Sequence, residues 1–255
     1  MAIRIICNKD LLKDPEKVKK NIESKRKEKK YKLPRIKFKS NIEKQQIDNY
    51  DIYKLYNNES DKIIIYLHGG SYINEAVSLH FKFVDKICIN SNMDIYFPIY
   101  PLAPNHTYKD AYKLILKLYK KLLKENKEII IIGDSAGGGL ALGFTLYLNE
   151  LNIKLPNKLV LLSPWVDITL SNPEIKKYEK NDPMLSCCGL VEYAKIWAGN
   201  TNLDDYKLSP IHGELLKLPN TLIFTGSNEL LYPDMIKFYK LLKKNKVKTK
   251  LIIGD

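Results

Sequence analysis

Residues 128–148 have the sequence EIIIIGDSAGGGLALGFTLYL. Four consecutive isoleucines at 129–132 are typical of a strand that is buried on both faces of a sheet. After them come Gly133-Asp134-Ser135-Ala136-Gly137 and an apolar run long enough for a helix. A serine on a sharp turn between a buried strand and a helix has a strained backbone, so the residues two positions away must be small. Gly133 and Gly137 meet this requirement, and the pattern predicts a nucleophile elbow with the Ser135 hydroxyl exposed.

A second glycine turn, His68-Gly69-Gly70-Ser71, follows the apolar segment 63–67. Glycine lets the backbone approach a ligand closely and present its N–H groups. A developing oxyanion needs two or three such donors. We expect Gly69 and Gly70 to donate, together with Ala136, the residue after the serine. His68 and Asp134 are predicted to be structural residues near this site.

The remaining chain alternates short apolar segments with amphipathic ones, which predicts an α/β fold with right-handed crossovers and a mostly parallel sheet. Strands are expected at 35–39, 50–56, 63–67, 94–97, 128–132, 158–162, 221–225 and 248–253. Helices are expected at 77–89, 107–125, 135–148, 188–198 and 233–244. Residues 167–212 are too long for a plain loop and are predicted to be a cap insertion at the carboxyl edge of the sheet.

The formal net charge is +13 and is spread unevenly along the chain. Residues 1–44 contain 16 Lys/Arg and 6 Asp/Glu, whereas the other 211 residues contain 26 Lys/Arg and 23 Asp/Glu and are therefore nearly neutral. We therefore divide the chain into a basic N-terminal segment, 1–45, which forms a cap or arm, and a core at 46–255. A basic segment of this kind can contact an anionic membrane surface. Aromatic residues do not interleave with the basic run at 25–30, so nucleic acid is not an expected partner.

Composition also limits the class of protein. No apolar run reaches the roughly 18 residues of a membrane-spanning helix. Four cysteines, Cys7, Cys88, Cys187 and Cys188, are too few for a disulfide framework, and none is part of a CxxC pair. The first residues lack the apolar core of a secretory signal. We expect a cytoplasmic protein without a metal or a cofactor.

Several stretches together resemble one family. The His-Gly-Gly turn and GDSAGG at 133–138 are accompanied by YPLAP at 100–104, SPWVD at 163–167, DPML at 182–185 and SPI at 209–211. Over roughly residues 50–255 the chain resembles the hormone-sensitive-lipase-like branch of the α/β-hydrolases, which includes bacterial carboxylesterases and acetyl esterases. The resemblance implies an α/β-hydrolase fold, ester substrates with short or medium acyl chains, and a helical cap formed by the N-terminus and the insertion.

The resemblance also indicates which carboxylate completes a catalytic triad. In TGSNELLYPD at 225–234, the family places the acid three residues after the glycine, which is Glu229. The family more often has aspartate there, and triad chemistry accepts either residue. Asp234 is the alternative, although its place after Pro233 also suits the N-terminus of a helix.

The histidine of the triad has no counterpart in residues 1–255. In this fold the order is serine, acid, histidine, but His68, His80, His106 and His212 all precede Glu229. His106 matches a family position that is not the base, and His212 is a weak substitute. We interpret the chain as truncated before the histidine loop and the last helix. The resulting hypothesis is a serine carboxylesterase, with a peptidase ranked lower. The alternative is a catalytically impaired hydrolase-fold protein that binds an ester-like ligand or a partner.

Overall fold

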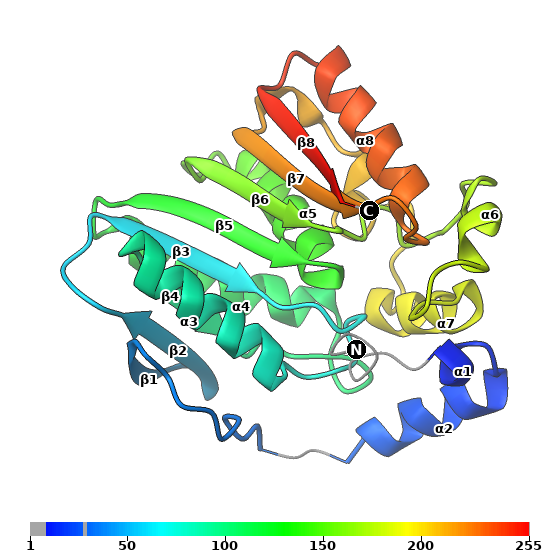
Figure 1. The fold of residues 1–255 in the computed structure, drawn as a ribbon, viewed down its shortest axis with the longest axis horizontal. Helices are drawn as coiled ribbons and strands as arrows, with labels where there is room; N and C mark the ends of the chain where they lie inside the picture. The colour runs from blue at the N-terminus through cyan, green and yellow to red at the C-terminus, as the bar shows by residue number, and fades with distance from the viewer. Residues whose placement is uncertain (1–8, 28–29, 255) are drawn as a thin grey trace.

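The computed structural model describes residues 9–27 and 30–254 (Figure 1). The expectations about Cys7 and about the first residues as a possible signal lie outside this part of the chain. An eight-stranded sheet with the order β1-β2-β4-β3-β5-β6-β7-β8 forms the centre. The strands are β1 Asn41–Ile47, β2 Tyr50–Tyr56, β3 Lys62–Leu67, β4 Asp94–Pro98, β5 Glu128–Asp134, β6 Lys158–Leu162, β7 Asn220–Gly226 and β8 Thr249–Gly254.

The sheet is parallel from β4 to β8, and β1 and β2 are antiparallel to their neighbours. Continuous isoleucine runs in β3 and β5 pair with each other, with Ile63 opposite Ile129 and Ile65 opposite Ile131. These side chains are buried on both faces of the sheet, as parallel strands in the middle of a covered sheet must be. The predicted fold class, an α/β-hydrolase fold with a mostly parallel sheet, is confirmed.

The two faces of the sheet are covered unequally. Three helices, α4 Tyr108–Leu123, α5 Ala136–Glu150 and α8 Tyr232–Lys244, contribute their apolar residues to one large core against the first face. On the second face, α3 Ser78–Ser91 packs against β2 and β4. In the described part of the chain no further helix reaches this second face over β6–β8 (Figure 1).

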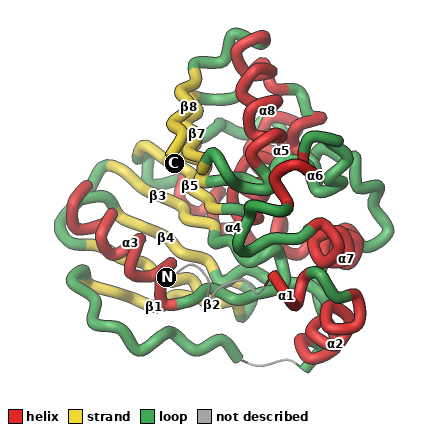
Figure 2. Tube along the Cα trace, turned by 45° about the vertical axis from the view of Figure 1, so that its right-hand side comes forward, coloured by secondary structure: helices red, strands yellow, loops and turns green. Residues whose placement is uncertain are grey.

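The insertion and the N-terminal segment meet beside the carboxyl ends of the strands. The insertion contains α6 Ile175–Glu179, α7 Cys187–Ala198 and a short 3-10 turn, Pro210–His212. The N-terminal helices α1 Lys9–Leu12 and α2 Pro15–Lys25 pack against α7, as both views show (Figures 1 and 2). The side-chain amide of Asn21 donates to the Tyr193 hydroxyl at 2.7 Å and links α2 to α7.

One predicted strand is wrong. Residues 35–39 form no strand. Their alternation arises because Ile36 and Phe38 pack against α3 and the sheet while the lysines face solvent. The outermost strand β1 was not expected, because NIEKQQI has almost no apolar residues and is largely exposed at the sheet edge. Within residues 9–27 and 30–254, no helix combines the length and the apolar character needed to cross a bilayer.

Candidate active site

Ser135 lies at the junction of β5 and α5, where the backbone makes a sharp turn. Its φ of 50° and ψ of −121° lie in a region that side chains rarely adopt. Such a conformation costs about 1–3 kcal/mol and persists only where the surroundings enforce it. The enforcing contacts are backbone hydrogen bonds: the Ser135 N–H donates to the Leu162 carbonyl at 2.8 Å, and its carbonyl accepts from Trp165 at 2.9 Å. Its hydroxyl donates to no group in the described chain and is partly exposed.

The glycines around the serine are required by close backbone approach. A Cβ on Gly133 would lie 2.2 Å from the carbonyl oxygen of Gly137. A Cβ on Gly137 would lie 2.1 Å from the carbonyl oxygen of Leu67, at the end of β3. Contacts this short are excluded for real side chains. The two glycines therefore let the turn after β3 pack directly against the elbow after β5.

The structure brings the His-Gly-Gly turn onto the serine. A Cβ built on Gly69 would lie 3.1 Å from the Ser135 Cβ. However, the Gly69 N–H donates to Asp134 Oδ1 at 2.9 Å, so this amide is already used within the protein. The expectation that Gly69 donates to an oxyanion is corrected on this point, because one N–H cannot make both bonds at full strength.

The amides of Gly70, Ser71 and Ala136 find no acceptor in the described chain. Gly70 and Ser71 follow Gly69 in the turn that approaches the serine, and Ala136 follows the serine directly. A buried N–H without a hydrogen-bond acceptor costs free energy in the folded protein. The oxygen of a bound ligand can supply the acceptor that these amides lack. Ser71 was not predicted. One feature of the sequence pointed to this arrangement, namely the carboxylate of Asp134 directly before the serine. Sequence spacing alone does not show which amide of the glycine turn donates to that carboxylate.

Asp134 connects the two turns. Besides the Gly69 amide, its Oδ1 accepts from the Tyr66 hydroxyl at 2.6 Å, and its Oδ2 lies 3.5 Å from His80 Nε2. Burial alone would raise the pKa of this carboxyl, but the contacts with His80 and Tyr66 outweigh it and lower the pKa. Asp134 therefore remains ionised and acts as an acceptor for the turn.

His68 is fully buried beneath the same turn. Its Nδ1 lies 2.7 Å from the Gly69 carbonyl, which can only accept, so Nδ1 carries the proton. Burial and the neighbouring His80 lower the pKa of His68 to about 4. Its ring stacks on Tyr100 at 4.4 Å between centroids. His68 is thus a neutral packing residue and does not reach the Ser135 hydroxyl.

Glu229 follows β7 and lies at the ends of the strands next to the elbow. Its Oε1 accepts from the Ser163 hydroxyl at 2.7 Å and from the Gly226 N–H at 3.0 Å. Its Oε2 is buried and accepts no hydrogen bond from the described chain. Burial raises the pKa of this carboxyl, and the bonds from Ser163 and Gly226 act in the opposite direction. One free carboxylate oxygen is thereby available to a donor that the described residues do not supply.

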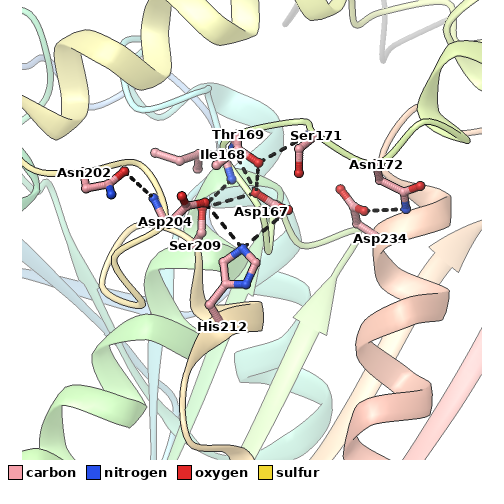
Figure 3. A network of polar contacts seen from close by, with 10 residues as sticks. All are labelled: Asp167, Ile168, Thr169, Ser171, Asn172, Asn202, Asp204, Ser209, His212 and Asp234. Atoms are coloured by element: carbon pink, nitrogen blue, oxygen red, sulfur yellow. Dashed lines mark hydrogen bonds and ion pairs between the residues drawn. The ribbon is translucent and has the colours of Figure 1, made fainter.

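Asp234, the alternative acid, belongs to a different network (Figure 3). It lies in the first turn of α8, where its Oδ1 accepts from Asn172 of the insertion at 2.8 Å. Buried Asp167 accepts from Thr169 nearby and lies 3.7 Å from His212 Nε2. His212 thus faces the carboxylates of the insertion. His106 lies 3.7 Å from Asp110 on the surface of α4.

Comparisons with known proteins agree with this architecture. A family model of the α/β-hydrolase fold matches residues 64–254. An esterase of Acinetobacter venetianus is 32% identical over 191 residues, which cover 73% of this chain and 63% of that protein. The chain belongs to the α/β-hydrolase family. An acetyl-hydrolase of Streptomyces hygroscopicus is 27% identical over 179 residues, covering 69% of this chain and 60% of the relative. The chain thus spans less than two thirds of the length of these two relatives.

Solved structures give the same result for this α/β-hydrolase. A candidate esterase from Staphylococcus aureus has a TM-score of 0.91 and 32% identity over 94% of this chain and 84% of its own. An esterase of the bacterial hormone-sensitive lipase family shares the fold, with a TM-score of 0.81 at 22% identity over 94% of this chain and 87% of its own. The resemblance drawn from the motifs is confirmed, and the family is one of esterase- and lipase-like hydrolases.

Proposed function

We propose that this α/β-hydrolase cleaves carboxylic esters with short or medium acyl chains through an acyl-enzyme on Ser135. The carrying observation is the position of the Ser135 hydroxyl, which is unpaired on a strained elbow beside the unpaired amides of Gly70, Ser71 and Ala136. These are two of the features that an acyl transfer requires, namely a free nucleophile and preorganised donors for the developing oxyanion. The N-terminus of α5 adds a favourable dipole at the same place.

The proposed reaction has two halves. Ser135 Oγ attacks the carbonyl carbon while a general base removes its proton, and the oxyanion accepts hydrogen bonds from the three amides. The bond to the alcohol oxygen then breaks, and the alcohol leaves with the proton. Water attacks the acyl-enzyme in the same way and releases the carboxylic acid and the free serine.

Glu229 is the proposed acid of the triad, and its buried, unpaired Oε2 is the position at which a histidine N–H would be held. His68, His80, His106 and His212 have other partners. We therefore infer that none of these four histidines acts as the general base. Without its base, a serine hydrolase of this type loses about 10⁶-fold in kcat.

Free imidazole can replace the missing side chain in a direct test. We expect residues 1–255 to hydrolyse p-nitrophenyl acetate at a rate that rises with imidazole, above the rate of a Ser135→Ala variant in the same imidazole. Ser91→Ala, in α3, is a matched control that keeps the activity. Glu229→Gln should lower the imidazole-dependent rate, whereas Asp234→Asn should not.

A fluorophosphonate probe gives an independent readout. In the presence of imidazole, it should label Ser135 covalently in the wild type and not in Ser135→Ala. If neither labelling nor imidazole-dependent turnover depends on Ser135, the proposal is wrong and the chain is a hydrolase-fold protein without ester chemistry.

A further inference from the structure

Directly after the His-Gly-Gly turn, the Tyr72 ring stacks with both tryptophans of the chain. The rings of Tyr72 and Trp197 are stacked and nearly parallel, with centroids 4.5 Å apart and an interplanar angle of 3°. Trp165 lies on Tyr72 at 5.7 Å and 20°. All three side chains are at most 2% exposed. We call these residues the aromatic stack; they come from the turn after β3, the turn after β6 and the end of α7.

The backbone next to this stack has an unusual conformation. Ser71 and Tyr72 both have positive φ values, 54° and 63°, and Gly70 has 131°. Positive φ in a residue other than glycine is unfavourable and must be enforced by neighbours. The carbonyls of this turn are fixed, because Ile73 and Asn74 donate to Gly70 and Ala103 donates to Tyr72 at 2.9 Å.

The N–H groups of Gly70 and Ser71 have no such anchor in the described chain. Their direction depends on the backbone torsions of residues 70–72, and those torsions are coupled to the position of the Tyr72 ring. A ring that stacks with two buried tryptophans cannot follow a flip of its backbone without breaking a buried aromatic contact, which contributes about 0.5–1.5 kcal/mol beyond its area.

We propose that Trp197 is a positioning residue for the oxyanion hole, acting through Tyr72. By stacking on Tyr72 it keeps residues 70–72 in the left-handed conformation in which the Gly70 and Ser71 amides face the carbonyl oxygen of a substrate at Ser135. This inference rests on the proposed function of Ser135.

Trp197 differs from Trp165 in its connection to the elbow. The backbone N–H of Trp165 donates to the Ser135 carbonyl, so Trp165 lies directly against the backbone of the nucleophile. Trp197 instead belongs to α7 of the insertion, against which α1 and α2 pack. Through the Trp197 ring, the packing of α1, α2 and α7 thus helps to orient the Gly70 and Ser71 amides.

The test uses Trp197→Leu, which keeps an apolar side chain but removes the stacking surface, and Trp197→Phe, which keeps a ring. Rates with p-nitrophenyl acetate and imidazole are divided by the amount of Ser135 that a fluorophosphonate labels. Loss of a whole oxyanion donor costs about 10²–10³ in kcat. Because Trp197→Leu would misorient the donors without removing them, we expect it to lower kcat about tenfold and to leave KM unchanged. Trp197→Phe should retain most of the wild-type kcat.

Three controls separate positioning from a general loss of structure. Phe238→Leu, on the buried face of α8, should lower the unfolding free energy and leave kcat per labelled serine unchanged. The Ki of an alkyl trifluoromethyl ketone, which adds to the serine as an oxyanion, should rise in Trp197→Leu by the factor by which kcat/KM falls. Tyr72→Leu should lower kcat similarly, and the double variant should lose no more than either single variant.

Two failures are distinguishable. If the wild type shows Ser135-dependent turnover and Trp197→Leu has the same kcat per labelled serine, the inference is overturned while the esterase proposal stands. If kcat falls but the ketone Ki does not follow, Trp197 does not act through the oxyanion, which also overturns the inference. Absence of Ser135-dependent turnover in the wild type overturns the proposed function, and the inference falls with it.

Discussion

Asp134 shows how much of the site depends on one side chain. Its Oδ1 accepts both the Gly69 amide and the Tyr66 hydroxyl, so the residue beside the serine fastens the turn after β3 to the elbow after β5. Charge-assisted bonds of this kind are roughly twice as strong as neutral ones. Because Gly69 is held in this way, Gly70 and Ser71 are the residues of the turn that keep unpaired amides.

Gly137 gives a prediction at the same scale. Gly137→Ala would place a Cβ 2.1 Å from the carbonyl oxygen of Leu67, and neither backbone segment can yield without separating the two turns. We expect a loss of at least about 3 kcal/mol in the free energy of unfolding, at the upper end for overpacked sites. We also expect loss of fluorophosphonate labelling at Ser135. Urea denaturation and labelling measure the two effects.

A matched glycine-to-alanine change serves as its control. A Cβ on Gly254, at the end of β8, would meet its nearest neighbour at 4.0 Å, which is ordinary contact. Gly254→Ala should therefore leave stability within about 0.5 kcal/mol of the wild type. Equal stability of the Gly137 and Gly254 variants would contradict the close approach of β3 and the elbow.

At the scale of elements, prediction succeeded where local sequence and tertiary burial agree. Thr107 illustrates this: the helix expected from residue 107 begins there as α4, and the Thr107 N–H donates to Asp110 Oδ2 at 3.0 Å. It failed for β1, whose polar residues form a strand because β2 provides a partner. It also missed α6, a short helix inside the insertion. Packing partners decide such segments, and they are not visible in a local pattern.

The residues of the candidate site were likewise predictable from the sequence only in part. Ser135, Gly133 and Gly137 could be selected from sequence because the elbow is a local motif whose steric demands fix the residue types. The use of the Gly69 amide and the stacking of Trp197 on Tyr72 could not be selected, since each joins segments more than 60 residues apart. Such pairings follow from the topology of the sheet and the insertion.

The contact between α8 and the insertion predicts a pH dependence of stability. Burial raises the pKa of Asp234 to about 6, although the Asn172 bond opposes the shift; Asp167 also raises this pKa, while Lys237 and His212 lower it. The folded protein therefore favours the protonated form of the Asp234 carboxyl. The stability that this group contributes is complete below its ordinary pKa of 3.8 and is lost as pH rises through about 6.

We expect the unfolding free energy of the wild type, measured relative to Asp234→Asn, to fall by about 2 kcal/mol between about pH 4 and about pH 7. Urea denaturation across this pH range measures it. The same change at an exposed residue, Asp61→Asn, controls for effects of replacing an aspartate by asparagine. A difference for Asp234→Asn that stays constant across this pH range would show that the pKa of this carboxyl is not shifted.

At the scale of the whole molecule, the unequal covering of the sheet leaves an apolar area. On the face opposite α5 and α8, Leu162 pairs with Phe224 and Phe224 with Ile252, which places the three side chains in one row across β6, β7 and β8. These residues are only partly buried, and Ile252 is 36% exposed. A contiguous apolar row on a sheet face favours association with other apolar surfaces.

Substitution on this row should therefore reduce association without unfolding the protein. Ile252→Lys is expected to lower the binding of an apolar dye such as ANS and the sedimentation of self-associated species by residues 1–255, with the unfolding free energy changed by less than about 0.5 kcal/mol. The adjacent residue Leu251 packs into the core on the opposite face, so Leu251→Lys should destabilise the fold and should not lower dye binding. If Ile252→Lys binds as much dye as the wild type, the exposed row is not the surface that drives association.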